Sequence, residues 1–275
     1  MVTVAEIDAT RLNVQREGHT AIWVLDGASS RNALFGEALF AAFEAAVLEA
    51  NGDAALRTVI LTGADPSFCS GGNTRDMMRR AGMFAGPPHA ICDQYRGGIQ
   101  RIARALERLE VPLIAAVNGA AIGAGCDLAC MCDLRVASAR ATFAESFVKV
   151  GIVPGDGGAW LLPRVVGYAR AAEMALTGDP VDAGKAKDIG LVSEVVAHDR
   201  LMARAHELAL SIGTNSPRAV RWTKRLLKRA VQGGLDDALE LAAAYQALAH
   251  HSPDHAESLR ALRERRTPFF DEAMR

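Results

Sequence analysis

Apolar residues near the start of the chain recur at strand spacing. Two β-rich runs, Leu12 to Arg16 and Thr20 to Leu25, flank the turn residue Gly18, and this pattern predicts a pair of strands. The next segment is predicted to be a helix, because the spacing of its apolar residues changes to that of a helix. Its apolar positions are Leu39, Phe43, Ala46, Val47 and Ala50.

Strands, glycine-bearing loops and helices then alternate. The β-branched run LRTVILTG suits a strand buried on both faces, and the loop SFCSGGN and a helix follow it. A single helix is expected over YRGGIQRIARALERLE, before the strand VPLIAAV and the glycine-bearing segment NGAAIGAGCDLACMCD. This alternation predicts an α/β fold with a largely parallel sheet and helical crossovers.

The pattern becomes almost wholly helical after about residue 200. Pro217, Gly233-Gly234 and Pro253 interrupt amphipathic segments, and a basic run from Lys224 to Arg229 is expected on a solvated helix face. We therefore divide the chain into a core over residues 1–200 and a helical region over residues 201–275. The apolar faces of this region indicate self-association.

Composition excludes several classes of protein. The 275 residues are 50% hydrophobic and carry 31 basic against 32 acidic side chains, so neither a nucleic-acid nor a membrane partner is expected. The N-terminal stretch has no signal-peptide pattern and no apolar run is long enough to span a bilayer, which predicts a cytoplasmic protein. Cys126, Cys130 and Cys132 have no histidine nearby in sequence, and no metal site is expected.

Two glycine-bearing turns are the strongest candidates for chemistry. No G-x-G-x-x-G, P-loop or G-x-S-x-G motif occurs in the chain. Turns of this kind present free backbone N–H groups, and two of them side by side could form an oxyanion hole for a carbonyl that becomes enolate-like. Asp127, near one turn, and Asp156, in the loop GIVPGDGGAW, are candidate proton-transfer groups. A helix cap and an Asx-turn remain the structural alternatives for these two acids.

Several long segments carry a family resemblance. SFCSGGNTRDM, AVNGAAIGAGCDLACMCDLRVAS and FAESFVKVGIVPGDGGAWLLPRVVG, in this order, resemble the crotonase superfamily, the enoyl-CoA hydratase/isomerase family. The resemblance implies a crotonase-like spiral of ββα repeats with a helical C-terminal trimerisation region, assembled as a homotrimer or a dimer of trimers. It also implies an acyl-CoA thioester substrate and no separate cofactor, because coenzyme A is part of the substrate.

The resemblance also assigns candidate site residues. It places the oxyanion-hole N–H groups at Ser70 and Ala124 and the catalytic acids at Asp127 and Asp156. It implies that substrate and coenzyme A contact a further set of positions. These are Arg31, Ala33, Ser70, Gly72, Asn73 and Thr74.

This chain departs from the hydratase pattern at two positions. Relatives that hydrate carry glutamates at the positions of Asp127 and Phe147, so a two-glutamate activation of water is not available here. Asp156 matches an aspartate of dienoyl-CoA isomerases and the nucleophile of chlorobenzoyl-CoA dehalogenase. Glu145, two residues before Phe147, is expected to be a structural acid that points to the other face of an extended segment.

These observations lead to one main hypothesis and two alternatives. The main hypothesis is an enzyme that stabilises a thioester enolate and transfers protons, either hydrating a 2-enoyl-CoA or moving the double bond of an enoyl-CoA. The first alternative is a hydrolase or dehalogenase in which Asp156 is the nucleophile. The second is a crotonase-like protein that binds acyl-CoA or RNA without catalysis.

Overall fold

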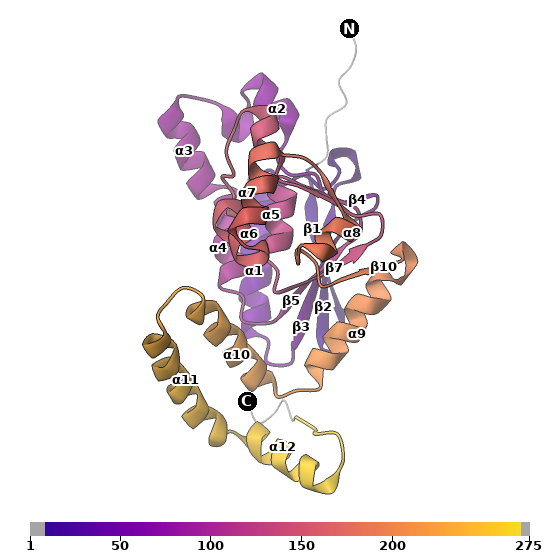
Figure 1. Cartoon of the computed structure of the whole chain (residues 1–275), viewed down its shortest axis with the longest axis vertical. Helices are drawn as coiled ribbons and strands as arrows, with labels where there is room; N and C mark the ends of the chain where they lie inside the picture. The colour runs from indigo at the N-terminus through magenta and orange to yellow at the C-terminus, as the bar shows by residue number, and fades with distance from the viewer. Residues whose placement is uncertain (1–8, 271–275) are drawn as a thin grey trace.

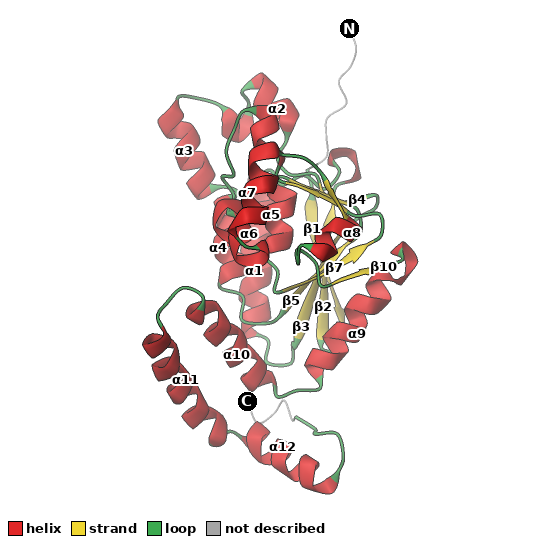
Figure 2. Cartoon of the chain, in the orientation of Figure 1, coloured by secondary structure: helices red, strands yellow, loops and turns green. Residues whose placement is uncertain are grey.

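A computed structural model describes residues 9–270 as an α/β core with helices extending from one end (Figures 1 and 2). Residues 1–8, the beginning of the stretch in which no targeting signal is found, lie outside the described residues. Within residues 9–270 no helix is both long enough and apolar enough to cross a bilayer.

The larger sheet has six strands in the order β1-β2-β3-β5-β7-β10. β1 and β2 pair antiparallel, as the hairpin pattern predicts, and the other neighbours pair parallel. Every residue of β3 and β5 is buried, which confirms the doubly buried strands expected from the sequence. The strands are β1 (Arg11–Glu17), β2 (Thr20–Asp26), β3 (Thr58–Gly63), β5 (Leu113–Val117), β7 (Leu134–Ser138) and β10 (Glu194–Val196).

A smaller sheet of short strands completes the spiral. β4 (Ser67–Cys69), β6 (Ala120–Ile122) and β8 (Thr142–Ala144) pair parallel, and β9 (Val181–Asp182) pairs antiparallel with β8. Each repeat sends one strand to the larger sheet and the next to the smaller, as β3-β4, β5-β6 and β7-β8 do, before a helix follows. The expected ββα spiral is thus confirmed, although the sequence pattern gave SFCS as loop.

Helices cover the sheets on both sides. One long helix was expected over YRGGIQRIARALERLE, but α3 (Pro88–Gly97) ends there and α4 (Gln100–Glu107) begins after a break. Gly98 has φ −113° and ψ −115°, which is not helical. The other core helices are α1 (Glu37–Gly52), α2 (Thr74–Arg79), α5 (Ala124–Cys130), α6 (Gly158–Val166), α7 (Tyr168–Thr177) and α8 (Ala183–Asp188). Short 3-10 helices are η1 (Ala28–Ser30), η2 (Gly82–Phe84), η3 (Ser146–Val150) and η4 (His198–Arg200).

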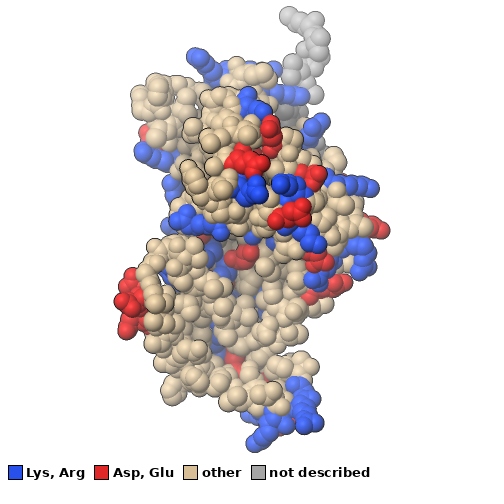
Figure 3. Space-filling model, viewed as in Figure 1, with Lys and Arg blue, Asp and Glu red and all other residues tan. Residues whose placement is uncertain are grey.

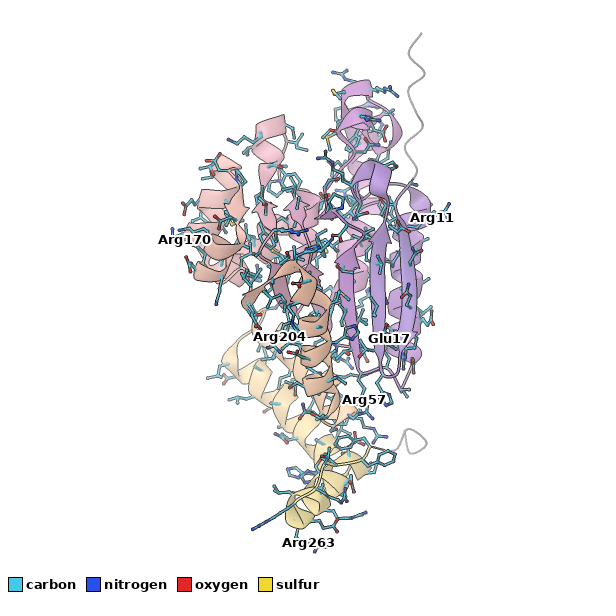
Figure 4. The ribbon with its side chains drawn as sticks, turned by 90° about the vertical axis from the view of Figure 1, so that its right-hand side faces the viewer. Arg11, Glu17, Arg57, Arg170, Arg204 and Arg263 are labelled. Atoms are coloured by element: carbon cyan, nitrogen blue, oxygen red, sulfur yellow. The ribbon has the colours of Figure 1, made fainter. Side chains whose placement is uncertain are left out.

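The C-terminal helical region divides into two parts. α9 (Leu201–Gly213) packs on the larger sheet, where Ala205 and Ala209 meet Ile60 and Ile114, so this helix is a layer of the core. Arg57, at the lower end of the sheet in Figure 4, donates to the Gly213 carbonyl at the end of α9. The division at residue 200 stays a prediction, and the helices that extend away begin with α10.

The outer helices are α10 (Pro217–Ala230), α11 (Leu235–His250) and α12 (Pro253–Glu264). The expectation of a solvated basic face is wrong for Lys224, which is buried and forms an ion pair with Asp133 at 2.6 Å. Large apolar side chains nevertheless lie exposed on these helices, namely Leu227, Val231, Leu235, Leu239, Leu248, Leu259 and Leu262. Basic and acidic side chains are interspersed over the core, and basic ones gather at the end of α12 (Figure 3).

Candidate active site

The two glycine-bearing turns lie side by side, as expected. β4 and β6, which lead into them, pair parallel. A Cβ on Gly125 would lie 2.8 Å from the carbonyl carbon of Cys69, so only glycine lets α5 approach β4 this closely. A Cβ on Gly71 would lie 3.3 Å from the backbone nitrogen of Ala124. The small residues of both motifs are therefore explained by close approach of two backbones.

The backbone donors of these turns are not equivalent. Ala124 is the first residue of α5, so its N–H has no partner within the helix. The Ser70 N–H, in contrast, donates to the carbonyl of Arg31 at 3.1 Å. The expectation of two free donors therefore needs correction, because a thioester oxygen would have to share or displace the bond to Arg31.

A cavity of about 110 Å³ opens beside these turns. Asp156 is the only carboxyl group among its lining residues. The rest of the wall is mostly apolar or aromatic, and Phe147 covers the turn at Gly123. The lining residues are Ser70, Gly72, Thr74, Met77, Met83, Phe84, Tyr95, Ile99, Ile122, Gly123, Ala124, Ser146, Phe147, Val150, Ile152 and Asp156.

Asp156 is held in a constrained loop before α6. Gln100 donates its side-chain amide to the Gly155 carbonyl at 2.9 Å, and the Tyr95 ring packs against the same residue. Gly157 follows with φ 123°, a conformation that side chains other than glycine rarely adopt. Burial, with the charge of Glu145 as a second cause, raises the pKa of Asp156 to about 6.

Asp127 lies in the first turn of α5, as predicted, but it does not line the cavity. It is completely buried against the start of α6, where a Cβ on Gly158 would lie 2.7 Å from its Cγ. Burial first, then the charge of Glu145, raises its pKa well above the usual value, and the charge of Asp156 adds to this effect. The two predicted acids are therefore neighbours with different exposure to the cavity.

Glu145 was expected to be a structural acid that points away from the side of Phe147, and it does not line the cavity that Phe147 lines. β8 ends at Ala144, and Glu145 has φ −89° and ψ 59°, so the segment is not extended at this residue. The chain turns into η3 here, and the Glu145 side chain is buried beside Asp127 and Cys126. Strand alternation does not explain this orientation, because residues two apart in an extended segment share a face and the segment is not extended at Glu145.

The expected coenzyme A residues occupy different positions. Gly72 and Thr74 line the cavity together with Ser70. Ala33 is buried, and Asn73 caps α2 by accepting from the Arg75 N–H at 3.1 Å. The exposed Arg31 contributes the carbonyl that bonds Ser70. Sequence reasoning passed over Asn32, which is buried and donates to the carbonyls of Ala64 and Ser67 at 2.7 Å, fixing this loop to the start of β4.

Metal binding finds no support in the described side chains. Within residues 9–270 no set of three His, Cys, Asp or Glu side chains is placed to hold a metal ion. All five cysteines are free thiols.

Comparison with known proteins defines the class. The enoyl-CoA hydratase/isomerase family profile matches residues 22–273. A short-chain-enoyl-CoA hydratase of Clostridium acetobutylicum is 34% identical over 92% of this chain and 94% of its own length. The 1,2-epoxyphenylacetyl-CoA isomerase of Escherichia coli is 36% identical over 79% of this chain and 82% of its own. An enoyl-CoA hydratase structure from Bacillus anthracis has a TM-score of 0.88 at 31% identity, covering 95% of this chain and 99% of that one.

The fold is that of the crotonase superfamily, with the cavity beside its paired turns. The chain belongs to the enoyl-CoA hydratase/isomerase family and is an enzyme of this type.

Replacing Gly158 with Ala should displace Asp127, because the new Cβ overlaps its carboxyl group. Overpacking of this kind costs about 1–3 kcal/mol of unfolding free energy, measurable by urea denaturation, and we expect turnover to fall with it. Gly52→Ala is the matched control, because no atom lies within 4 Å of a Cβ added there. Equal stability of the two variants would show that Asp127 does not occupy this position.

Proposed function

We propose that this enzyme moves the double bond of an enoyl-CoA thioester and that Asp156 is its single acid–base group. The observation that carries the proposal is that no other carboxyl group lines the cavity. Asp127 lies behind the wall, and Phe147 occupies the position at which hydrating relatives carry a second glutamate. A proton shuttle between two carbons needs one such group, whereas two-carboxylate activation of water needs two.

The proposed reaction conserves its proton. The Asp156 carboxylate removes a proton from the α carbon of a 3-enoyl thioester, and the electron pair moves onto the thioester oxygen. Asp156 then returns the proton to the γ carbon, and the double bond forms between the α and β carbons. A pKa near 6 leaves Asp156 mostly ionised at neutral pH and still able to return a proton.

Backbone donors are proposed to hold the thioester oxygen. The Ala124 N–H, at the first position of α5, supplies one hydrogen bond, and the helix end adds partial positive charge. The Ser70 N–H supplies the second by sharing or exchanging its bond to Arg31. Gly72 and Thr74 line the cavity beside these donors. Contacts of coenzyme A with Arg31, Ala33 and Asn73 stay predictions.

The proposals on assembly and location rest on the exposed surface and on the sequence alone. The exposed leucines of α10, α11 and α12 support contact with other copies of this chain. The homotrimer or dimer of trimers is what the family resemblance implies. A cytoplasmic location and the lack of a separate cofactor stay predictions from the sequence.

The direct test follows the absorbance of the conjugated thioester. With a 3-enoyl-CoA we expect the signal to rise, and with the matching 2-enoyl-CoA we expect it to stay flat, because no second carboxylate activates water. Loss of the 2-enoyl signal would instead identify a hydratase. Release of free coenzyme A from these thioesters, or of chloride from a chlorinated acyl-CoA, would favour Asp156 as a nucleophile. Binding without any turnover would favour a non-catalytic protein.

Asp156→Asn should abolish isomerisation and stabilise the fold above pH 6. The folded pKa of about 6 lies above the usual value of about 3.9, so between these values the folded chain binds more protons than the unfolded chain. The stability of the wild type therefore falls as pH rises through this window, by about 3 kcal/mol at 1.36 kcal/mol per pKa unit. Denaturation at pH 4 and pH 8 measures the effect. A variant that gains nothing at pH 8 would contradict the raised pKa.

Ala124→Pro should remove one oxyanion donor without breaking α5, since proline is tolerated at the first helical position. Loss of one such donor lowers kcat about 10²–10³-fold. Ala124→Gly keeps the N–H and serves as the control. Similar turnover in both variants would exclude the Ala124 N–H from the reaction.

A further inference from the structure

Three carboxyl groups are buried together behind and beside the cavity. Asp127 is 0%, Glu145 1% and Asp156 5% exposed. They come from α5, from the turn after β8 and from the loop before α6. When all three groups are ionised, both oxygens of Asp127, both of Glu145 and one of Asp156 have no hydrogen-bond partner within residues 9–270. Such burial without a cation is costly and calls for a chemical explanation.

We propose that Glu145 is a third functional acid of this site, which forms with Asp127 a buried carboxyl pair holding one shared proton and so positions that pair behind Asp156. The reaction proposed above uses only Asp156, and this inference rests on that function. Glu145 itself does not line the cavity, so it is a positioning residue.

A shared proton follows from the geometry of the pair. The side chains of Asp127 and Glu145 are close enough to form a hydrogen bond with one another. Two carboxylates are both acceptors, so this bond exists only when one of them is protonated. Burial raises the pKa of Glu145, but the hydrogen bond between the two side chains lowers it and raises the pKa of Asp127, so the proton belongs on Asp127. The pair therefore carries a single negative charge, on Glu145.

The other titratable neighbours do not supply a charge that would change this result. Cys126 and Cys130 face the pair from α5, and Cys69 and Tyr95 face Asp156. Burial raises the pKa of Cys69 to about 12 and also raises that of Tyr95, and that of Cys126 is raised by its bond to Cys130 and by burial. Cys69, Tyr95 and Cys126 are thus neutral at pH 7, and the negative charge that raises the pKa of Asp156 is that of Glu145.

The consequence for catalysis is a base of adjusted strength. The charge of Glu145 opposes ionisation of Asp156 and raises its pKa, beyond the effect of burial. An ordinary aspartate is a weak base at neutral pH, and the raised value brings Asp156 closer to the operating range of proton transfer. Glu145 thus adjusts the pKa of Asp156 through its charge, which the uncharged side chain of Phe147 cannot do.

The experiment measures the pH dependence of kcat/KM for isomerisation in three variants. Glu145→Gln removes the charge and keeps the acceptor for Asp127, so the acid-side midpoint should fall by about one pH unit from its value near 6. Asp127→Asn keeps the charge on Glu145, so its midpoint should not fall. Glu173→Gln removes an exposed charge that pairs with Arg170 at 2.8 Å and should leave the profile unchanged.

A second readout does not depend on activity. The infrared carbonyl stretch of a protonated carboxyl group should be present in the wild type at pH 7 and absent in Asp127→Asn. Its frequency should change in Glu145→Gln, because the acceptor of its proton changes. No such band in the wild type, or one unaffected by both substitutions, would overturn the proposal, as would an unshifted midpoint in Glu145→Gln. Absence of turnover with the band present would reject the isomerase function alone.

Discussion

The close packing around the buried carboxyl group of Asp127 constrains the rest of the site. Its carboxyl group lies against Gly158 on one side and Glu145 on another, with no room for a side chain at the start of α6. Gly125 meanwhile allows α5 to lie against β4. Because Gly125 meets the carbonyl group of Cys69 through backbone atoms, neither turn can move without displacing the other. The proposed oxyanion donor at Ala124 and the buried acids thus depend on the same close approach.

This arrangement lowers the stability of the folded chain. Each buried carboxyl group loses its hydration. Within residues 9–270 none of the three forms an ion pair with a lysine or arginine that would offset this loss. The compensation comes from the surrounding core, where β3 and β5 are buried on both faces. Proton sharing reduces the charge that has to be buried. The expected stabilisation by Asp156→Asn and the loss of activity have one cause, the desolvation of a reactive carboxylate.

The sequence could predict what periodicity and motif order determine. The doubly buried strands, the two neighbouring turns and the place of Asp127 on α5 all follow from such patterns. Strands of three residues such as β4 are too short to show a period, and the break at Gly98 depends on local backbone geometry. Strand alternation could not place Glu145 beside Asp127, because β8 ends at Ala144 and the chain turns into η3 there. The bond from Ser70 to Arg31 joins residues far apart in sequence.

The proposed isomerisation rests on the number of carboxyl groups that line the cavity. Addition of water across a double bond requires a base for the water and an acid for the carbon, both within reach of the substrate. Here Asp156 is the only carboxyl group that lines the cavity, and Phe147 contributes an apolar ring to the wall instead of a second acid. In the proposed isomerisation one carboxyl group removes and returns the proton, and the negative charge that forms on the thioester oxygen is proposed to lie at the N-terminal end of α5.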